Sequence, residues 1–126
     1  PMYIIIVHFY LCNITAELAP MRVIPGSHRA GRPPGSEERE WRGLAPEVIT
    51  ARAGDCLIFR SDVWHAGSPN RTTRDIRYLL QVHYGRREMA QHFSPFMEWR
   101  FNPVVLAAAT KRQRRLLGDH PPGAYD

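Results

Sequence analysis

The chain has 126 residues and a formal net charge of +5, with 44% apolar and 23% charged residues. This composition is typical of one small globular domain and excludes a disordered or fibrous chain. The longest apolar run, residues 2–12, is about half as long as a bilayer span and contains His8, so we expect a buried strand and no membrane partner. Because no basic leader precedes this run, the default expectation is a cytoplasmic protein.

The first half of the chain predicts short strands joined by long turns. Apolar residues on both alternating faces of residues 3–11 indicate a strand that is covered on both sides. Since a chain rarely begins inside its most hydrophobic strand, we expect residue 1 not to be the natural start. A short strand at 21–25 is followed by a loop at 26–43 that is rich in Gly, Pro and charge, as lids and binding loops often are.

Three further strands are predicted in the middle of the chain. Residues 46–50 and 55–59 are expected to form a hairpin, in which Gly54 takes a positive φ. Residues 75–85 alternate clearly and form the last strand. These elements predict an all-β core, as in a sandwich or jelly roll.

The pattern changes after residue 85. Residues 102–118 have helix-forming composition, with Gly118 as the expected C-cap, and a Pro-rich ending follows. We therefore expect residues 1–85 to form the β domain and residues 86–126 to form a helical and Pro-rich extension packed on it.

The last predicted strand carries polar side chains on one face, which alternation gives as Arg77, Leu79, Gln81 and His83. We expect this strand to be buried, and a buried guanidinium needs an anion because it cannot lose its proton. A carboxylate held by two hydrogen bonds is its natural partner. His65 comes just before the turn that leads to this strand, so an antiparallel return would bring it close to Arg77. The pair predicts a site that holds a metal-bound dicarboxylic acid at both ends.

Four separated features of the sequence carry a resemblance to a known family. They are "MRVIPGSHR", "ITARAGDCLIFRSDVWHAGSPN", the arginine in "DIRYLLQVHY" and "RQRRLLGDHPPGAYD". Together they resemble the phytanoyl-CoA dioxygenase family of iron(II)- and 2-oxoglutarate-dependent oxygenases. The resemblance implies a double-stranded β-helix, a cupin-like jelly roll, that holds Fe(II) through two histidines and one carboxylate. Open iron positions then receive 2-oxoglutarate, O₂ and the approaching small-molecule substrate.

The resemblance also implies roles for three residues. His65 resembles the distal iron ligand, and Arg77 resembles the residue that pairs with the far carboxylate of 2-oxoglutarate. His8 lies where the family often has an aromatic residue beside the cosubstrate, so it is expected to line that site. The implied reaction hydroxylates an aliphatic carbon of a small molecule and decarboxylates 2-oxoglutarate to succinate.

One feature of the family is missing from the sequence. Its other two iron ligands come from an H-x-D or H-x-E motif, and the 126 residues contain neither. A single ligand is too few to hold iron. We therefore expect this chain to be the C-terminal part of a longer enzyme, and to be inactive alone.

Simpler interpretations stay open. His65 could be a turn histidine in solvent. Arg77 could form an internal salt bridge with Asp62 or Asp75, and Arg74 is its rival for the carboxylate.

Two other functions also stay open. If the chain does begin near residue 1, a metal-free jelly-roll module that binds an anionic small molecule is the alternative. Nucleic-acid binding through the basic residues 111–115 is the weakest hypothesis because no aromatic platform accompanies them, so we expect no nucleic-acid partner.

Overall fold

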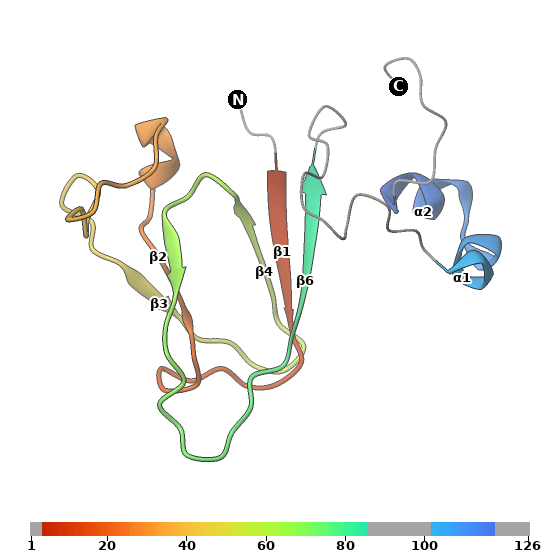
Figure 1. Cartoon of the computed structure of the whole chain (residues 1–126), viewed down its shortest axis with the longest axis horizontal. Helices are drawn as coiled ribbons and strands as arrows, with labels where there is room; N and C mark the ends of the chain where they lie inside the picture. Colours follow the sequence, from red (N-terminus) through yellow and green to blue (C-terminus); the bar gives the residue numbers. More distant parts are fainter. Residues whose placement is uncertain (1–3, 86–101, 118–126) are drawn as a thin grey trace. The chain divides into compact units, whose positions relative to one another are not determined.

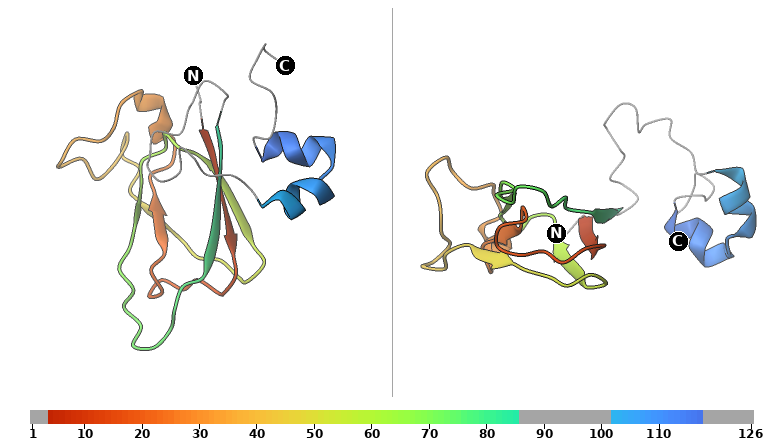
Figure 2. Two further views of the ribbon diagram at one scale, coloured as in Figure 1. Left: turned by 45° about the vertical axis from the view of Figure 1, so that its right-hand side comes forward. Right: turned by 90° about the horizontal axis from the view of Figure 1, so that it is seen from below.

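The computed structural model describes residues 4–85 and 102–117. The chain divides into two compact units, Pro1–Arg86 and Arg87–Asp126. The first unit is β-structured and contains two small antiparallel sheets, while the helices α1 and α2 belong to the second unit (Figures 1 and 2).

Each sheet of the first unit has three strands. One sheet has the order β4-β1-β6, formed by Cys56–Arg60, Ile4–Tyr10 and Leu79–Gly85. The other has the order β3-β2-β5, formed by Glu47–Ile49, Met21–Val23 and His65–Gly67. The predicted all-β core is thus confirmed as a predominantly β unit with two sheets.

Strand β1 is the centre of its sheet, and the predicted first strand is confirmed. Its β-branched residues suit a strand that packs on both faces. Val7 points to one face of the sheet, Ile6 and Tyr10 point to the other, and all three are buried. The chain after β1 continues this core, because Ile14 and Leu18 cluster with Tyr10 where the chain passes from one sheet to the other.

The predicted hairpin between β3 and β4 is wrong. Strand β3 pairs with β2, whereas β4 pairs with β1, so the two strands lie in different sheets. The reason is that the connecting segment bonds to the chain around the end of β1. The amide of Gly54 donates to the carbonyl of Tyr10 at 2.8 Å, and Ala51 and Ile14 exchange two backbone hydrogen bonds. The positive φ expected at Gly54 is confirmed at 94°.

The last strand is shorter and more exposed than predicted. It begins at Leu79 rather than at residue 75, and it lies at the edge of its sheet in the part of the chain that the structure describes. Arg77, Gln81 and His83 are therefore exposed, and the expected buried polar face is wrong. The apolar face is also open to solvent, with Leu80 exposed by 52% and Tyr84 by 41%.

The second unit contains two short helices where the sequence predicted one. α1 is Pro103–Ala108 and α2 is Lys111–Leu116. The helix stops at Ala109, whose backbone is extended, and Thr110 starts α2 through a capping box with Gln113. The expected C-cap, Gly118, lies outside the described residues. Neither described helix is long and apolar enough to cross a membrane.

The turn at Gly54 allows a test of this architecture. We expect Gly54→Ala to lower the free energy of unfolding by about 1–2 kcal/mol, because its φ of 94° is strained for an L-residue although the space around it is open. Gly67→Ala is the matched control, since its surroundings are equally open and its φ lies outside the positive region. Urea unfolding of both variants measures the difference. Equal stabilities would show that this turn is not required to take the positive φ.

Candidate functional site

His65 lies at the start of β5, opposite Val23 of β2, and its side chain is exposed. Its Nδ1 atom lies 2.7 Å from the carbonyl oxygen of Val63. Because a carbonyl can only accept a hydrogen bond, Nδ1 carries the proton, and in the neutral form of the ring the lone pair then lies on Nε2. Metal-binding histidines commonly have this arrangement, in which a backbone carbonyl holds the nitrogen that does not bind the metal.

A row of aromatic rings connects the two sheets at this point. The ring centroid of Phe59 on β4 lies 5.1 Å from that of His65 and 5.1 Å from that of His8, with edge-to-face geometry in both cases. The structure therefore brings together two histidines that are far apart in the sequence. The sequence offered no signal for Phe59 beyond that of an ordinary core residue.

His8 is a buried histidine with an unsatisfied nitrogen. The residue is 7% exposed, and its Nε2 atom has no hydrogen-bond partner among residues 4–85 and 102–117. Burial lowers the pKa of His8 most, and electrostatic interactions with Arg77, His65 and His83 lower it further. The ring is therefore held neutral, and its free nitrogen is available to a polar ligand.

Tyr10 is a second buried residue with an unsatisfied polar atom. Its hydroxyl has no hydrogen-bond partner in the part of the chain that the structure describes, and the residue is 4% exposed. Burial raises the pKa of Tyr10, while the charge of Arg77 acts in the opposite direction. Tyr10 lies on the same face of β1 as His8, and their ring centroids are 6.2 Å apart. Alternation along β1 could have indicated this residue, but a tyrosine in an apolar run was interpreted only as core.

Arg77 lies just before β6, and no carboxylate of the described residues forms an ion pair with its guanidinium. Its Nη1 atom donates to the carbonyl of Ala19 at 2.6 Å. Asp62 pairs with Arg60 instead, at 2.6 Å, and within residues 4–85 neither Asp62 nor Asp75 forms an ion pair with Arg77. The internal salt bridge that would have explained Arg77 without a ligand is thus not formed there.

The carbonyl that Arg77 contacts is presented by an unusual backbone. Ala19 has a φ of 45°, which is unfavourable for any residue with a side chain, and Pro20 follows it. Such outliers persist where the surrounding structure holds them, often beside functional sites. The contact leaves the other nitrogens of the Arg77 guanidinium available for an anion.

The described residues include one side chain, that of His65, with the arrangement of a metal ligand. The ring of His65 is held through Nδ1, and no described residue forms a hydrogen bond with its Nε2. Residues 4–85 and 102–117 contain no group of three side chains that could hold a metal ion. Further ligands would have to come from other residues. Nearby, Arg77, His8 and Tyr10 provide one charged and two neutral polar groups for a ligand with carboxylate chemistry.

Comparison with known proteins identifies the family of the chain. The model of the phytanoyl-CoA dioxygenase (PhyH) family matches residues 1–78, which include His8, His65 and Arg77. The chain belongs to the phytanoyl-CoA dioxygenase family. Members of this family generally use Fe(II) and 2-oxoglutarate and are typically 2-oxoglutarate-dependent dioxygenases.

The lowered pKa of His8 gives a pH-dependent prediction. When the pH falls below 6.5, the usual value for histidine, the unfolded chain gains a proton at this residue and the folded protein does not. The free energy of unfolding therefore decreases until the pH reaches the lowered pKa of the folded state. His8→Phe should remove this part of the decrease and be at least as stable at alkaline pH, because it also removes the unsatisfied nitrogen. Urea unfolding on either side of pH 6.5 tests this, and an unchanged pH dependence would contradict it.

Proposed function

We propose that this chain contributes the distal part of the active site of an Fe(II)- and 2-oxoglutarate-dependent dioxygenase. The observation that carries the proposal is the ring of His65, which the carbonyl of Val63 holds through Nδ1. Near it, and considering the described residues only, Arg77 has no carboxylate partner and Nε2 of His8 has no hydrogen-bond partner. The reaction would hydroxylate an aliphatic carbon of a small molecule in the cytoplasm. The family's double-stranded β-helix is the architecture that we propose for the complete domain.

His65 would bind Fe(II) through Nε2. The carbonyl of Val63 keeps the proton on Nδ1, so the ligand needs no change of tautomer before it binds the metal. The iron centre, when bound, supplies O₂ activation and the oxidative decarboxylation of 2-oxoglutarate to succinate. Two further ligands would come from residues other than those the structure describes.

Arg77 would hold the far carboxylate of 2-oxoglutarate. Its Nη1 is anchored on Ala19, and its remaining donors have no carboxylate partner among the described residues. Tyr10 provides a hydroxyl that can donate to the same carboxylate, and the charge of Arg77 is close enough to affect the pKa of Tyr10 and of His8. His8, held neutral, would line the cosubstrate site through Nε2 and would not compete with Arg77 for the anion as a second charge.

The metal role of His65 can be tested without knowing the substrate. Anaerobic addition of Fe(II) and 2-oxoglutarate to the full-length protein should give the visible charge-transfer band of a chelated 2-oxoacid. His65→Ala should abolish the band, because the ring supplies one of the few ligands that the metal has. His28→Ala, in the loop at 26–43, is the control and should retain it. A normal band in the His65 variant would refute the ligand assignment.

The carboxylate role of Arg77 has a matched control in Arg74. Arg77→Ala should raise the 2-oxoglutarate concentration needed for half of the band by roughly 10- to 100-fold, because a charge-assisted hydrogen bond contributes about 1.5–3 kcal/mol. Arg74→Ala removes an exposed arginine from the preceding loop and should leave this concentration unchanged. If the two variants behave in the opposite way, Arg74 holds the carboxylate.

A metal-free binding module remains the second candidate. It is favoured by the absence of a three-ligand group in residues 4–85 and 102–117. Such a protein would bind 2-oxoglutarate or another dicarboxylate through Arg77 without added metal. Calorimetric titration with 2-oxoglutarate in the presence of a chelator separates the two, since only the module would retain its affinity.

A further inference from the structure

Trp64 is the residue that connects the loop at 26–43 to the candidate ligand His65. It is 5% exposed and immediately precedes His65. Its amide donates to the Oγ of Ser27 at 2.8 Å, and its carbonyl accepts from the amide of Ile24 at 2.9 Å. The hydroxyl of Ser27 in turn donates to the carbonyl of Ile24 at 2.7 Å. Ser27 therefore links the end of β2 to the start of β5, and it is 0% exposed.

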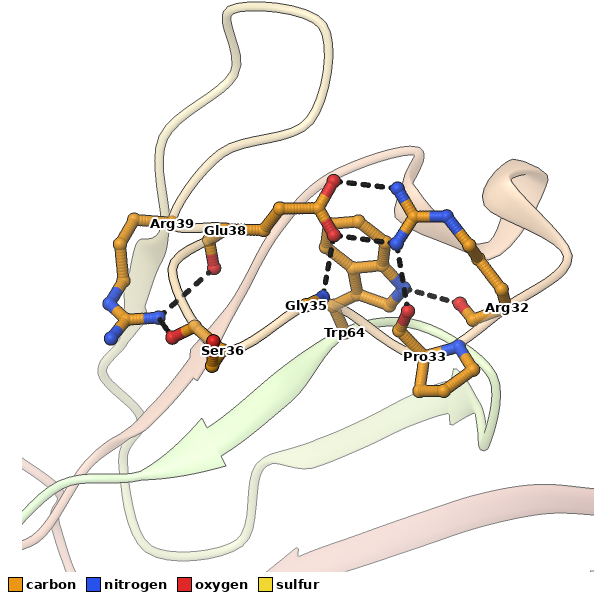
Figure 3. A network of polar contacts seen from close by, with 7 residues as sticks. All are labelled: Arg32, Pro33, Gly35, Ser36, Glu38, Arg39 and Trp64. Carbon is orange, nitrogen blue, oxygen red and sulfur yellow. Dashed lines mark hydrogen bonds and ion pairs between the residues drawn. The ribbon is translucent and has the colours of Figure 1, made fainter.

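The side chain of Trp64 is held by the same loop (Figure 3). Its indole Nε1 donates to the carbonyl of Arg32 at 2.9 Å, and the guanidinium of Arg32 lies 5.4 Å from the ring centroid. Glu38 fixes that guanidinium through two hydrogen bonds of 2.5 and 2.6 Å. Trp41 contacts the indole edge to face, with ring centroids 5.5 Å apart. We name these residues, Ser27, Arg32, Glu38, Trp41 and Trp64, the Trp64 clamp.

The conformation of Glu38 is itself well determined. Its carboxylate accepts from the amide of Gly35 at 2.6 Å in addition to the bonds from Arg32. The bonds from Arg32 first, and from Gly35 second, lower the pKa of Glu38 to about 2. The loop therefore keeps its internal ion pair at any pH at which the protein would operate.

The geometry points to a positioning role for the Trp64 clamp, in which Ser27 fixes the backbone around Trp64 and thereby holds the imidazole of His65 with Nε2 free. The carbonyl that holds Nδ1 belongs to Val63, and Trp64 is the one residue between that carbonyl and His65. Fixing both backbone polar groups of Trp64 thus fixes both ends of this hydrogen bond. The inference rests on the proposed function for the ligand role of His65 and assigns Ser27 no direct part in the chemistry.

The first experiment compares two serine variants of the same loop. Ser27→Ala removes a buried hydroxyl and leaves the amide of Trp64 without its acceptor, whereas Ser36→Ala makes the same change at an exposed residue. Long-range ¹H–¹⁵N spectra of the metal-free protein report which nitrogen of His65 carries the proton. We expect the wild type and Ser36→Ala to show the Nδ1–H tautomer and Ser27→Ala to show a mixture with the Nε2–H tautomer.

Metal affinity provides a second measurement on the same variants. Ser27→Ala should weaken anaerobic Fe(II) binding by about 10- to 100-fold, as the loss of outer-shell support usually does. Ser36→Ala should leave the binding unchanged. If Ser27→Ala keeps a single Nδ1–H tautomer and the wild-type affinity, Ser27 does not position His65 and the inference is wrong.

Glu38→Gln keeps the test decisive if Ser27→Ala does not fold. Glu38 is on the outside of the clamp, so this variant leaves every buried group in place and should fold normally. We expect faster hydrogen exchange of the Trp64 indole N–H, a minor Nε2–H form of His65, and a loss of Fe(II) affinity of no more than about fivefold. Faster indole exchange with an unchanged His65 tautomer would show that the loop holds Trp64 alone, and would overturn the inference.

Failure of the proposed function gives a different result. The tautomer is measured without metal, so it reports the positioning of the ring whether or not iron binds. If Ser27→Ala shifts the tautomer but the wild-type protein binds no Fe(II), the clamp positions His65 for another purpose and the dioxygenase proposal fails. If the wild type binds Fe(II) and the tautomer does not respond, only the clamp inference fails.

Discussion

The structure depends on the pairing of β1 with a strand on each edge. Strands β4 and β6 form hydrogen bonds with the backbone of β1 on both edges. Any unfavourable free energy of burying this strand therefore comes from its side chains. Ile6, His8 and Tyr10 point to the same face, and all three are buried. Two of these three side chains carry polar atoms that the described residues leave without partners. A buried donor or acceptor of this kind is costly unless a ligand or water completes it. Strand β1 therefore forms the core of its sheet and also places two polar side chains, His8 and Tyr10, in the interior.

The sequence predicted the parts of this arrangement that depend on local pattern. The apolar run around β1 and the positive φ of Gly54 are both local, since each follows from a few adjacent side chains. The pairing of β3 and β4 was wrong because a turn signal shows that the chain bends and does not show which strands meet afterwards. Here the bend is stabilised by the carbonyl of Tyr10, about forty residues away in the sequence.

The candidate site also contains residues that the sequence could indicate and residues that it could not. Arg77 stood out because a guanidinium on a strand that was expected to be buried needs an anion, and His65 stood out because it precedes the turn that leads to this strand. The resemblance to the family implied a role for both residues. Phe59 and Tyr10 could not be singled out, because an aromatic residue in a strand has the same sequence signal whether it fills the core or lines a site. The hydrogen bond from His65 to Val63 depends on side-chain rotamer and backbone direction, which no sequence pattern specifies.

The charges of the site favour the entry of an anion. Burial lowers the pKa of His8 most strongly, and the positive charge of Arg77 acts in the same direction. A carboxylate that pairs with Arg77 would offset the effect of the Arg77 charge and leave the effect of burial. The pKa of His8 should therefore rise on binding, though burial would still hold it low, and the ring would stay neutral at physiological pH. In the proposed site, one permanent charge would therefore recognise the carboxylate, while a neutral imidazole and a hydroxyl would add hydrogen bonds without adding a charge that would have to be buried.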